Sequence, residues 1–358
     1  MELTVDVDGS PTRGLAYPAL VGRPVAGDRV LLNTTALHQG LGTGGYALVV
    51  AIPDRLPPDP SPASASPVAP DLASDASPPL VPRSQVGHIV KCRYSPLQAT
   101  VLSADEQDSP WHEALRDADN IEGMPVVVAD LHSALPAVLA GVFDSTKRAV
   151  AYVMTDGAAL PAWFSRAAAG LREAGWLAGV VTTGQSFGGD VEAVTLHSGL
   201  LAARLVLGAE IAIVTQGPGN AGTGTRWGYS GVQAGEAVNA AAALGGRPVA
   251  SLRVTSADPR ERHQGISHHS LTAYGRVALA PADVVIPELP GEFGDRIMRE
   301  AAPLGDRHRL VTVPVDGLEE ALRSCPVRLS TMGRSLDEDL SYFLAAAASG
   351  RHAATLLP

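Results

Sequence analysis

Residues 256–269 hold the densest group of chemically capable side chains in the chain. Two carboxylates, two guanidinium groups and three imidazoles fall within twelve residues: Asp258, Glu261, Arg260, Arg262, His263, His268 and His269. An imidazole can transfer protons near neutral pH, and a guanidinium group can bind an anionic substrate. Carboxylate and imidazole groups also suit a divalent metal. Asp258, His263 and His268 are the metal-ligand candidates, although their spacing matches no standard zinc motif.

A glycine-rich turn at residues 216–231 contains no carboxylate and carries Arg226. Its backbone N–H groups can cradle a phosphate or carboxylate, with Arg260 and Arg262 assisting. The glycines that would approach the anion are Gly217, Gly219, Gly222 and Gly224. A rigid surface loop would use the same glycines.

The same turn contains the pattern G-x-G-x-x-G at residues 217–222. In a dinucleotide-binding unit the helix starts at this motif, and an acidic residue follows the next strand. Here the expected helix starts some residues later, and Arg253 stands where that acid would be. The late helix start and the missing acid therefore argue against a standard NAD-binding site.

A third polar turn, residues 182–190, contains G-x-S-x-G around Ser186 and ends at Asp190. That motif is typical of the nucleophile of serine hydrolases, and Asp258 followed by a histidine would supply the order of a triad. Two glycines and Asp190 separate Ser186 from the expected helix, which weakens this interpretation. Asp190 is predicted to be the N-cap of that helix, and it is a further acid/base candidate.

Each turn follows an apolar run that predicts a strand. Helical periodicity follows the turns at residues 182–190 and 216–231. The predicted strands cover residues 125–129, 149–154, 176–183, 211–215, 248–254, 284–287 and 310–315. The predicted helices include residues 161–175, 191–207, 232–244, 292–302 and 336–348. This alternation predicts a three-layer α/β domain over residues 106–358 with a mostly parallel sheet. In such a sheet the turns share one rim, where ligands bind.

Residues 1–105 are predicted to form a small β-rich, barrel-like domain. Its short runs at residues 30–33 and 46–52 are β-prone, and residues 87–102 are expected to pair with the second of them. A segment rich in proline, alanine and serine, residues 53–84, interrupts this domain. Its composition predicts a disordered, dispensable insertion.

Composition limits the kind of protein. The formal charge of −10 argues against nucleic-acid binding, which needs a basic face. Two cysteines among 358 residues fit a reducing compartment. Neither a signal peptide nor an apolar run of about 20 residues is present, so we expect a cytoplasmic protein without a membrane partner.

Three sequences in these turns, TGQSFGGDVEAVTLHSGL, QGPGNAGTGT and DPRERHQGISHHSLT, carry a resemblance to a known family. The chain resembles an uncharacterised bacterial family that is catalogued only as a domain of unknown function. The resemblance extends over nearly the whole chain, including LGTGGYALVV and GHIVKCRYSPLQ. It implies a shared architecture but supplies no reaction and no catalytic residue.

The sequence thus favours an enzyme that binds a small anionic metabolite, such as a phosphorylated one, on the rim of the α/β domain. Asp190, His263, His268 and His269 are the acid/base candidates. The sequence identifies no cofactor, and it leaves open whether the protein binds a divalent metal. Two other functions stay open as well: a serine hydrolase using Ser186, and a non-catalytic ligand-binding or homo-oligomeric scaffold protein.

Overall fold

The structure is a computed structural model that describes residues 1–40, 44–56, 87–95 and 97–357. It divides into two compact units, Met1–Val86 and Gly87–Pro358. The sequence placed this division near residue 105. The hairpin of β5 (Ile89–Lys91) and β6 (Ala99–Val101) explains the difference, because it belongs to the second unit.

The first unit contains a four-stranded mixed sheet in the order β1-β2-β4-β3. Its strands are β1 (Glu2–Val7), β2 (Ser10–Leu15), β3 (Leu31–Asn33) and β4 (Ala47–Ala51). Strand β4 pairs with β2 and β3, so the predicted pairing of residues 46–52 with residues 87–102 is wrong. Two short helices, α1 (Pro18–Val21) and α2 (Thr35–His38), complete the unit. Beyond Leu56, the predicted disordered insertion lies outside the described residues.

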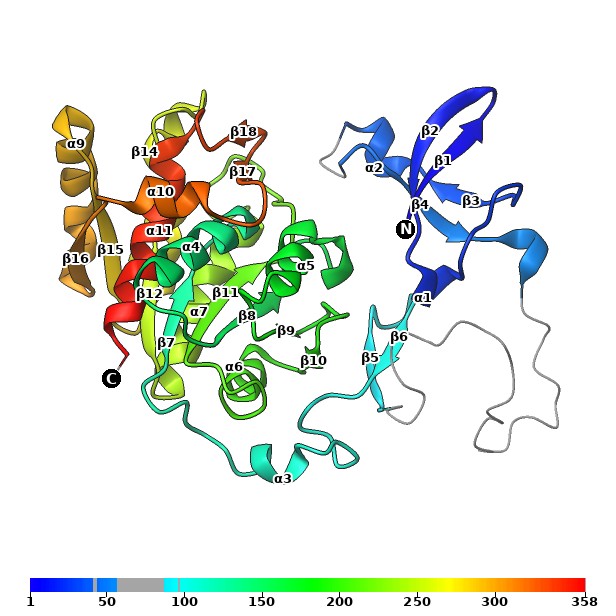
Figure 1. Cartoon of the computed structure of the whole chain (residues 1–358), viewed down its shortest axis with the longest axis horizontal. Coiled ribbons are helices and arrows are strands. Elements are labelled where there is room, and N and C mark those ends of the chain that lie inside the picture. The colour runs from blue at the N-terminus through cyan, green and yellow to red at the C-terminus, as the bar shows by residue number, and fades with distance from the viewer. Residues whose placement is uncertain (41–43, 57–86, 96, 358) are drawn as a thin grey trace. The chain divides into compact units, whose positions relative to one another are not determined.

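The second unit is built on an eight-stranded sheet in which every pairing is parallel (Figure 1). The sheet order is β10-β9-β8-β11-β7-β12-β15-β16. In chain order the strands are β7 (Pro125–Val128), β8 (Val150–Thr155), β9 (Gly179–Thr182), β10 (Val191–Glu192), β11 (Ile211–Gln216), β12 (Arg247–Ser251), β15 (Asp283–Glu288) and β16 (Arg309–Pro314). The predicted α/β class with a mostly parallel sheet is confirmed.

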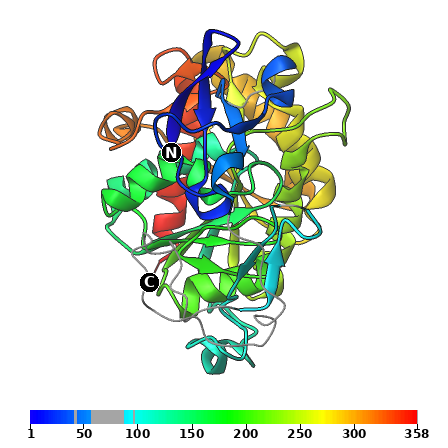
Figure 2. The same ribbon diagram turned by 90° about the vertical axis from the view of Figure 1, so that its right-hand side faces the viewer.

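Helices cover both faces of this sheet, as Figure 2 shows. One face carries α4 (Leu135–Ser145), α5 (Arg166–Glu173), α10 (Leu318–Arg323) and α11 (Leu340–Thr355). The other carries α6 (Leu196–Leu205), α7 (Gln233–Ala243), the π-helix η8 (Ala273–Val277) and α9 (Gly291–Ala301). Two short helices accompany the second group: α3 (His112–Leu115), whose Leu115 belongs to the same core, and α8 (His268–Thr272), which runs directly into η8. Because both faces are covered, the central strands are continuous buried apolar runs rather than alternating ones.

The core is made mostly of small aliphatic side chains, which lets backbones approach closely. Helices α4 and α11 meet at Gly141 and Gly350. A Cβ atom at Gly141 would lie 1.8 Å from the carbonyl oxygen of Ala347, and one at Gly350 would lie 1.9 Å from that of Val138. Larger side chains would therefore force these helices apart.

Four shorter strands lie outside the large sheet in two hairpins. They are β13 (Val254–Thr255) with β14 (Gly265–Ile266), and β17 (Ser330–Thr331) with β18 (Arg334–Ser335). The first hairpin encloses residues 256–264, which include His263, and His268 and His269 lie just beyond β14. The second brings the C-terminal part of the chain next to it.

Candidate functional site

The three polar turns follow β9, β11 and β12, which are not adjacent strands. Strand β8 lies between β9 and β11, and β7 lies between β11 and β12. Consecutive strands in such sheets are usually neighbours, but these three turns are not adjacent on the rim. The turns do lie at the carboxyl ends of parallel strands, so they share one rim.

A change of direction in the sheet lies at the centre of this rim. After β7 the chain continues into α4 on one face, and after β11 it continues into α7 on the other. A small cavity lies at the ends of β7, β8 and β11, where this divergence opens the sheet. Its polar lining includes Asp130, Thr155, Gln216 and Gln233. The Oε1 atom of Gln216 is buried and finds no hydrogen-bond partner among the described residues.

Three histidines gather beside this position. His263 ends a 3-10 turn (Glu261–His263), and His268 and His269 open α8. Each ring offers one nitrogen, and the three nitrogens lie within 4.8 Å of one another. His263 and His269 are buried, whereas His268 is partly exposed. The structure therefore brings together the three imidazoles that the sequence selected.

Their surroundings keep these rings neutral at physiological pH. Burial, followed by the charge of Arg253, lowers the pKa of His263 to about 3. Burial is also the main reason that the pKa of His269 falls to about 2. The pKa of His268 is lowered by burial and then by the charge of Arg262, which places that guanidinium group near the cluster.

Two residues that the sequence did not select complete the cluster. Asp130 lies two residues beyond the end of β7 and is 3% exposed; its Oδ2 atom lies 3.9 Å from Nδ1 of His269. Tyr229 stacks on His269 with a centroid distance of 3.7 Å and an interplanar angle of 3°, and its hydroxyl donates to the carbonyl oxygen of His269 at 2.8 Å. An acid directly after a buried strand was a usable signal for Asp130. No local pattern marked Tyr229.

Three buried atoms of the cluster are unsatisfied. Oδ2 of Asp130, Nε2 of His268 and Nδ1 of His269 have no hydrogen-bond partner within the part of the chain that the structure describes. Burial raises the pKa of Asp130, although the charge of Arg253 opposes this. Buried polar atoms are usually paired, so a group of unpaired ones at one place is evidence of a ligand or functional site.

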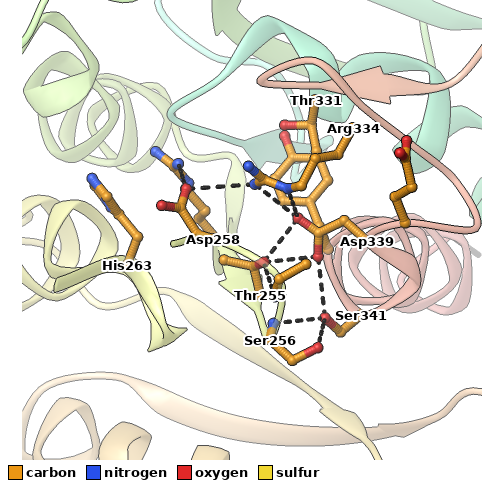
Figure 3. Close-up of polar contacts among 12 residues, drawn as sticks. Thr255, Ser256, Asp258, His263, Thr331, Arg334, Asp339 and Ser341 are labelled. Carbon is orange, nitrogen blue, oxygen red and sulfur yellow. Dashed lines mark hydrogen bonds and ion pairs between the residues drawn. The ribbon is translucent and has the colours of Figure 1, made fainter. Parts of the chain in front are cut away.

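Asp258, which the sequence proposed as a metal ligand, holds a different role. Its carboxylate accepts two hydrogen bonds from the Arg260 guanidinium group at 2.8 Å and also pairs with Arg253 at 3.3 Å and with Arg334 at 3.5 Å. Figure 3 labels Asp258 and His263 and draws contacts of the Asp258 carboxylate as dashed lines. The predicted set of Asp258, His263 and His268 is therefore not the one assembled, and His269 takes the place of Asp258.

The C-terminal hairpin extends this ion-pair network (Figure 3). Arg334 also pairs with the buried carboxylate of Asp339 at 2.9 Å, and Asp339 accepts from the Thr255 hydroxyl at 2.8 Å. Ser341 donates to Asp339 at 3.3 Å. Residues about eighty positions apart thus hold the histidine segment in place, and no spacing in the sequence reveals this.

The glycine-rich turn after β11 lies against the histidine segment. Gly217 is buried, and a Cβ atom there would lie 2.4 Å from the carbonyl oxygen of Ala159. The candidates Gly219, Gly222, Gly224 and Arg226 are exposed. A Cβ atom at Gly224 would lie 4.0 Å from a guanidinium nitrogen of Arg262. The second and third turns therefore meet, with Arg262 between the loop and the histidines.

The turn after β9 is organised differently. Ser186 is fully buried, and its hydroxyl lies 3.0 Å from the carbonyl oxygen of Met154 and 2.7 Å from that of Thr183. Strand β10, rather than a helix, follows the turn. An elbow serine stands exposed at the start of a helix, and Ser186 shows neither feature.

Asp190 is not an N-cap. Its carboxylate accepts from the backbone N–H of Val180 at 2.9 Å and pairs with Arg172 at 2.5 Å. Helix α6 starts later, at Leu196, where Thr195 and Ser198 form a capping box. The prediction was wrong because β10 occupies the first residues of the expected helix.

Comparison with known families identifies the chain. Residues 13–350 match the model of a family described as a protein of unknown function (DUF3866). The chain belongs to this family, as the turn sequences indicated. No curated protein and no solved structure matches the chain.

Among the described residues, no helix is both long enough and apolar enough to cross a membrane.

Proposed function

We propose that this protein is an enzyme that binds a small anionic metabolite where the glycine-rich turn meets the histidine segment. The contact between Gly224 and Arg262 carries this proposal, because it places an exposed cation beside a carboxylate-free loop. Arg262 also acts electrostatically on His268. An anion held by Arg262 would therefore lie next to the unsatisfied atoms of the cluster.

The other arginine candidate has a different task. Arg260 is engaged by both carboxylate oxygens of Asp258. Arg260 orders the segment, which leaves Arg262 as the anion-binding group. Backbone N–H groups around Gly219, Gly222 and Gly224, with Arg226, would complete the cradle.

The charge around the site also favours an anion. Arg253, Arg260 and Arg334 share the two carboxylates of Asp258 and Asp339. Asp130, on which the charge of Arg253 also acts, balances the third of these cations. The exposed charge of Arg262 is therefore the one that an anionic substrate would neutralise.

The test is titration of the full chain with inorganic phosphate in chloride buffer containing EDTA, followed by calorimetry. Replacing Arg262 with Ala should weaken phosphate binding about tenfold or more, as expected for a charged hydrogen bond. Arg276→Ala is the matched control, because Arg276 is an exposed arginine in η8, outside both the glycine-rich turn and residues 256–269. Equal phosphate affinity in the wild-type protein and Arg262→Ala would contradict the proposal.

A further inference from the structure

We propose that His263, His268 and His269 together bind one divalent transition-metal ion, zinc being the best suited, beside the carboxylate of Asp130. This proposal goes beyond the anion site and does not depend on it. Zinc in catalytic sites is held by three protein ligands, with three histidines as one of the known sets, and keeps a further position open for water or substrate.

One hydrogen bond and two unpaired atoms indicate which nitrogen of each ring would bind the metal. Nδ1 of His263 lies 2.7 Å from the Ser267 hydroxyl, which leaves its Nε2 atom for a metal. The unsatisfied atoms of the other two rings are Nε2 of His268 and Nδ1 of His269. A metal ion would satisfy both of these atoms at once, which no single protein side chain nearby does.

The supporting contacts have the character of a metal site. A histidine ligand usually donates its second ring N–H to an oxygen, and Ser267 provides that oxygen for His263. The same hydroxyl accepts the backbone N–H of His269 at 3.2 Å, so it positions both residues. Tyr229 fixes the His269 ring by stacking on it.

The charges are compatible with a cation. Arg253 would repel a metal ion, but its guanidinium group is paired with Asp258. Asp130 lies 3.9 Å from His269 and would offset the charge of the ion.

Small movements of the three rings would bring their nitrogens to metal-binding distance. Zinc–nitrogen bonds of about 2.0–2.1 Å place tetrahedral ligand atoms about 3.4 Å apart. The three nitrogens lie within 4.8 Å of one another, so ring movements on the order of 1 Å suffice. The partly exposed ring of His268 has the most freedom to make this movement.

The experiment measures metal alone, without any anionic ligand. The full chain, with any affinity tag removed, is stripped with EDTA, dialysed and titrated with zinc chloride in a calorimeter. One zinc ion per chain is expected. His268→Ala should weaken zinc binding by more than the roughly 10- to 100-fold that loss of an outer partner costs. His197→Ala, on the exposed face of α6, is the matched control.

Cobalt(II) supplies a second readout, because tetrahedral cobalt has intense visible absorption. The wild-type protein and His197→Ala should show this absorption, and His268→Ala should lose it while keeping its far-ultraviolet circular dichroism. Absence of stoichiometric binding in the wild type, or equal binding in His268→Ala, would overturn the metal proposal. Absence of zinc binding in the wild-type protein, with retained, Arg262-dependent phosphate binding, would overturn the metal site and leave the anion site standing.

Discussion

The turns after β9 and β12 both lie at the carboxyl edge of one sheet and both contain buried polar groups, but the hydrogen bonding of these groups differs. In the β9 turn, Lys91 donates to the carbonyl oxygens of Gly184, Ser186 and Ala193 at 2.8–3.0 Å. Glu192, whose pKa is raised by burial, pairs with the same ammonium group at 3.6 Å. In the β12 turn, Nε2 of His268 and Nδ1 of His269 have no hydrogen-bond partner among the residues that the structure describes.

This contrast separates structural from functional polarity. A buried polar group that is fully paired stabilises one conformation. A buried group without a partner costs free energy and persists where it serves a ligand or a reaction. The G-x-S-x-G pattern drew attention to the β9 turn, but its satisfied hydrogen bonds mark that turn as structural. The β12 turn is the functional candidate.

The largest expected effect comes from breaking the β9 turn. Lys91→Met leaves three carbonyl oxygens and the buried Glu192 without their cation. We expect the free energy of unfolding to fall by about 3–5 kcal/mol, as when one partner of a buried pair is removed. Urea denaturation measures this. Lys147→Met, at an exposed lysine, is the control and should change stability by less than about 0.5 kcal/mol. A similarly small effect for Lys91→Met would show that the turn does not depend on its cation.

The next effect concerns the framework of the β12 turn. Burial opposes ionisation of Asp258, but the hydrogen bonds and charge of Arg260 and the charge of Arg253 outweigh it and hold its pKa far below the usual value. Asp258→Asn should therefore cost about 2–3 kcal/mol at pH 7, because charged hydrogen bonds are lost. Asp306→Asn, at an exposed acid, is the control.

The pH dependence gives this prediction its sign. A carboxylate with a depressed folded-state pKa stabilises the protein above its unfolded pKa, near 4, and loses this contribution as the pH falls below that value. The difference between wild type and Asp258→Asn in urea denaturation should narrow by about 1 kcal/mol between pH 7 and pH 3. A difference that stays constant would mean that the ionised form of Asp258 is not favoured by folding.

The smallest expected effect on stability is that of His268→Ala, which tests most directly whether the β12 turn differs from the β9 turn. His268 is partly exposed, and its buried Nε2 atom has no partner within the described residues, so His268→Ala removes no hydrogen bond from that atom. We expect the free energy of unfolding to change by less than about 1 kcal/mol. Thermal and urea denaturation of metal-free protein measure this. A loss as large as that for Lys91→Met would place His268 among the structural residues.

The sequence by itself predicted most strands of the sheet and selected the three histidines of the candidate site. Buried apolar runs such as residues 125–129 and 211–215 predicted strands because both faces of a parallel sheet are covered. The histidines at 263, 268 and 269 were selected because their side chains, within seven residues, have few structural reasons to occur together. Local composition and periodicity carry information of this kind.

The tertiary structure decided the order of the strands and the partners of each polar group. Strand β8 separates β9 from β11 because the chain reverses its direction along the sheet, and no local pattern encodes a crossover. Asp258 was assigned to Arg253, Arg260 and Arg334, and Asp130 to the neighbourhood of His269, by contacts across as many as 139 positions. Whether a buried carboxylate supports the fold or faces a ligand depends on which cations reach it. That is a property of packing between distant segments.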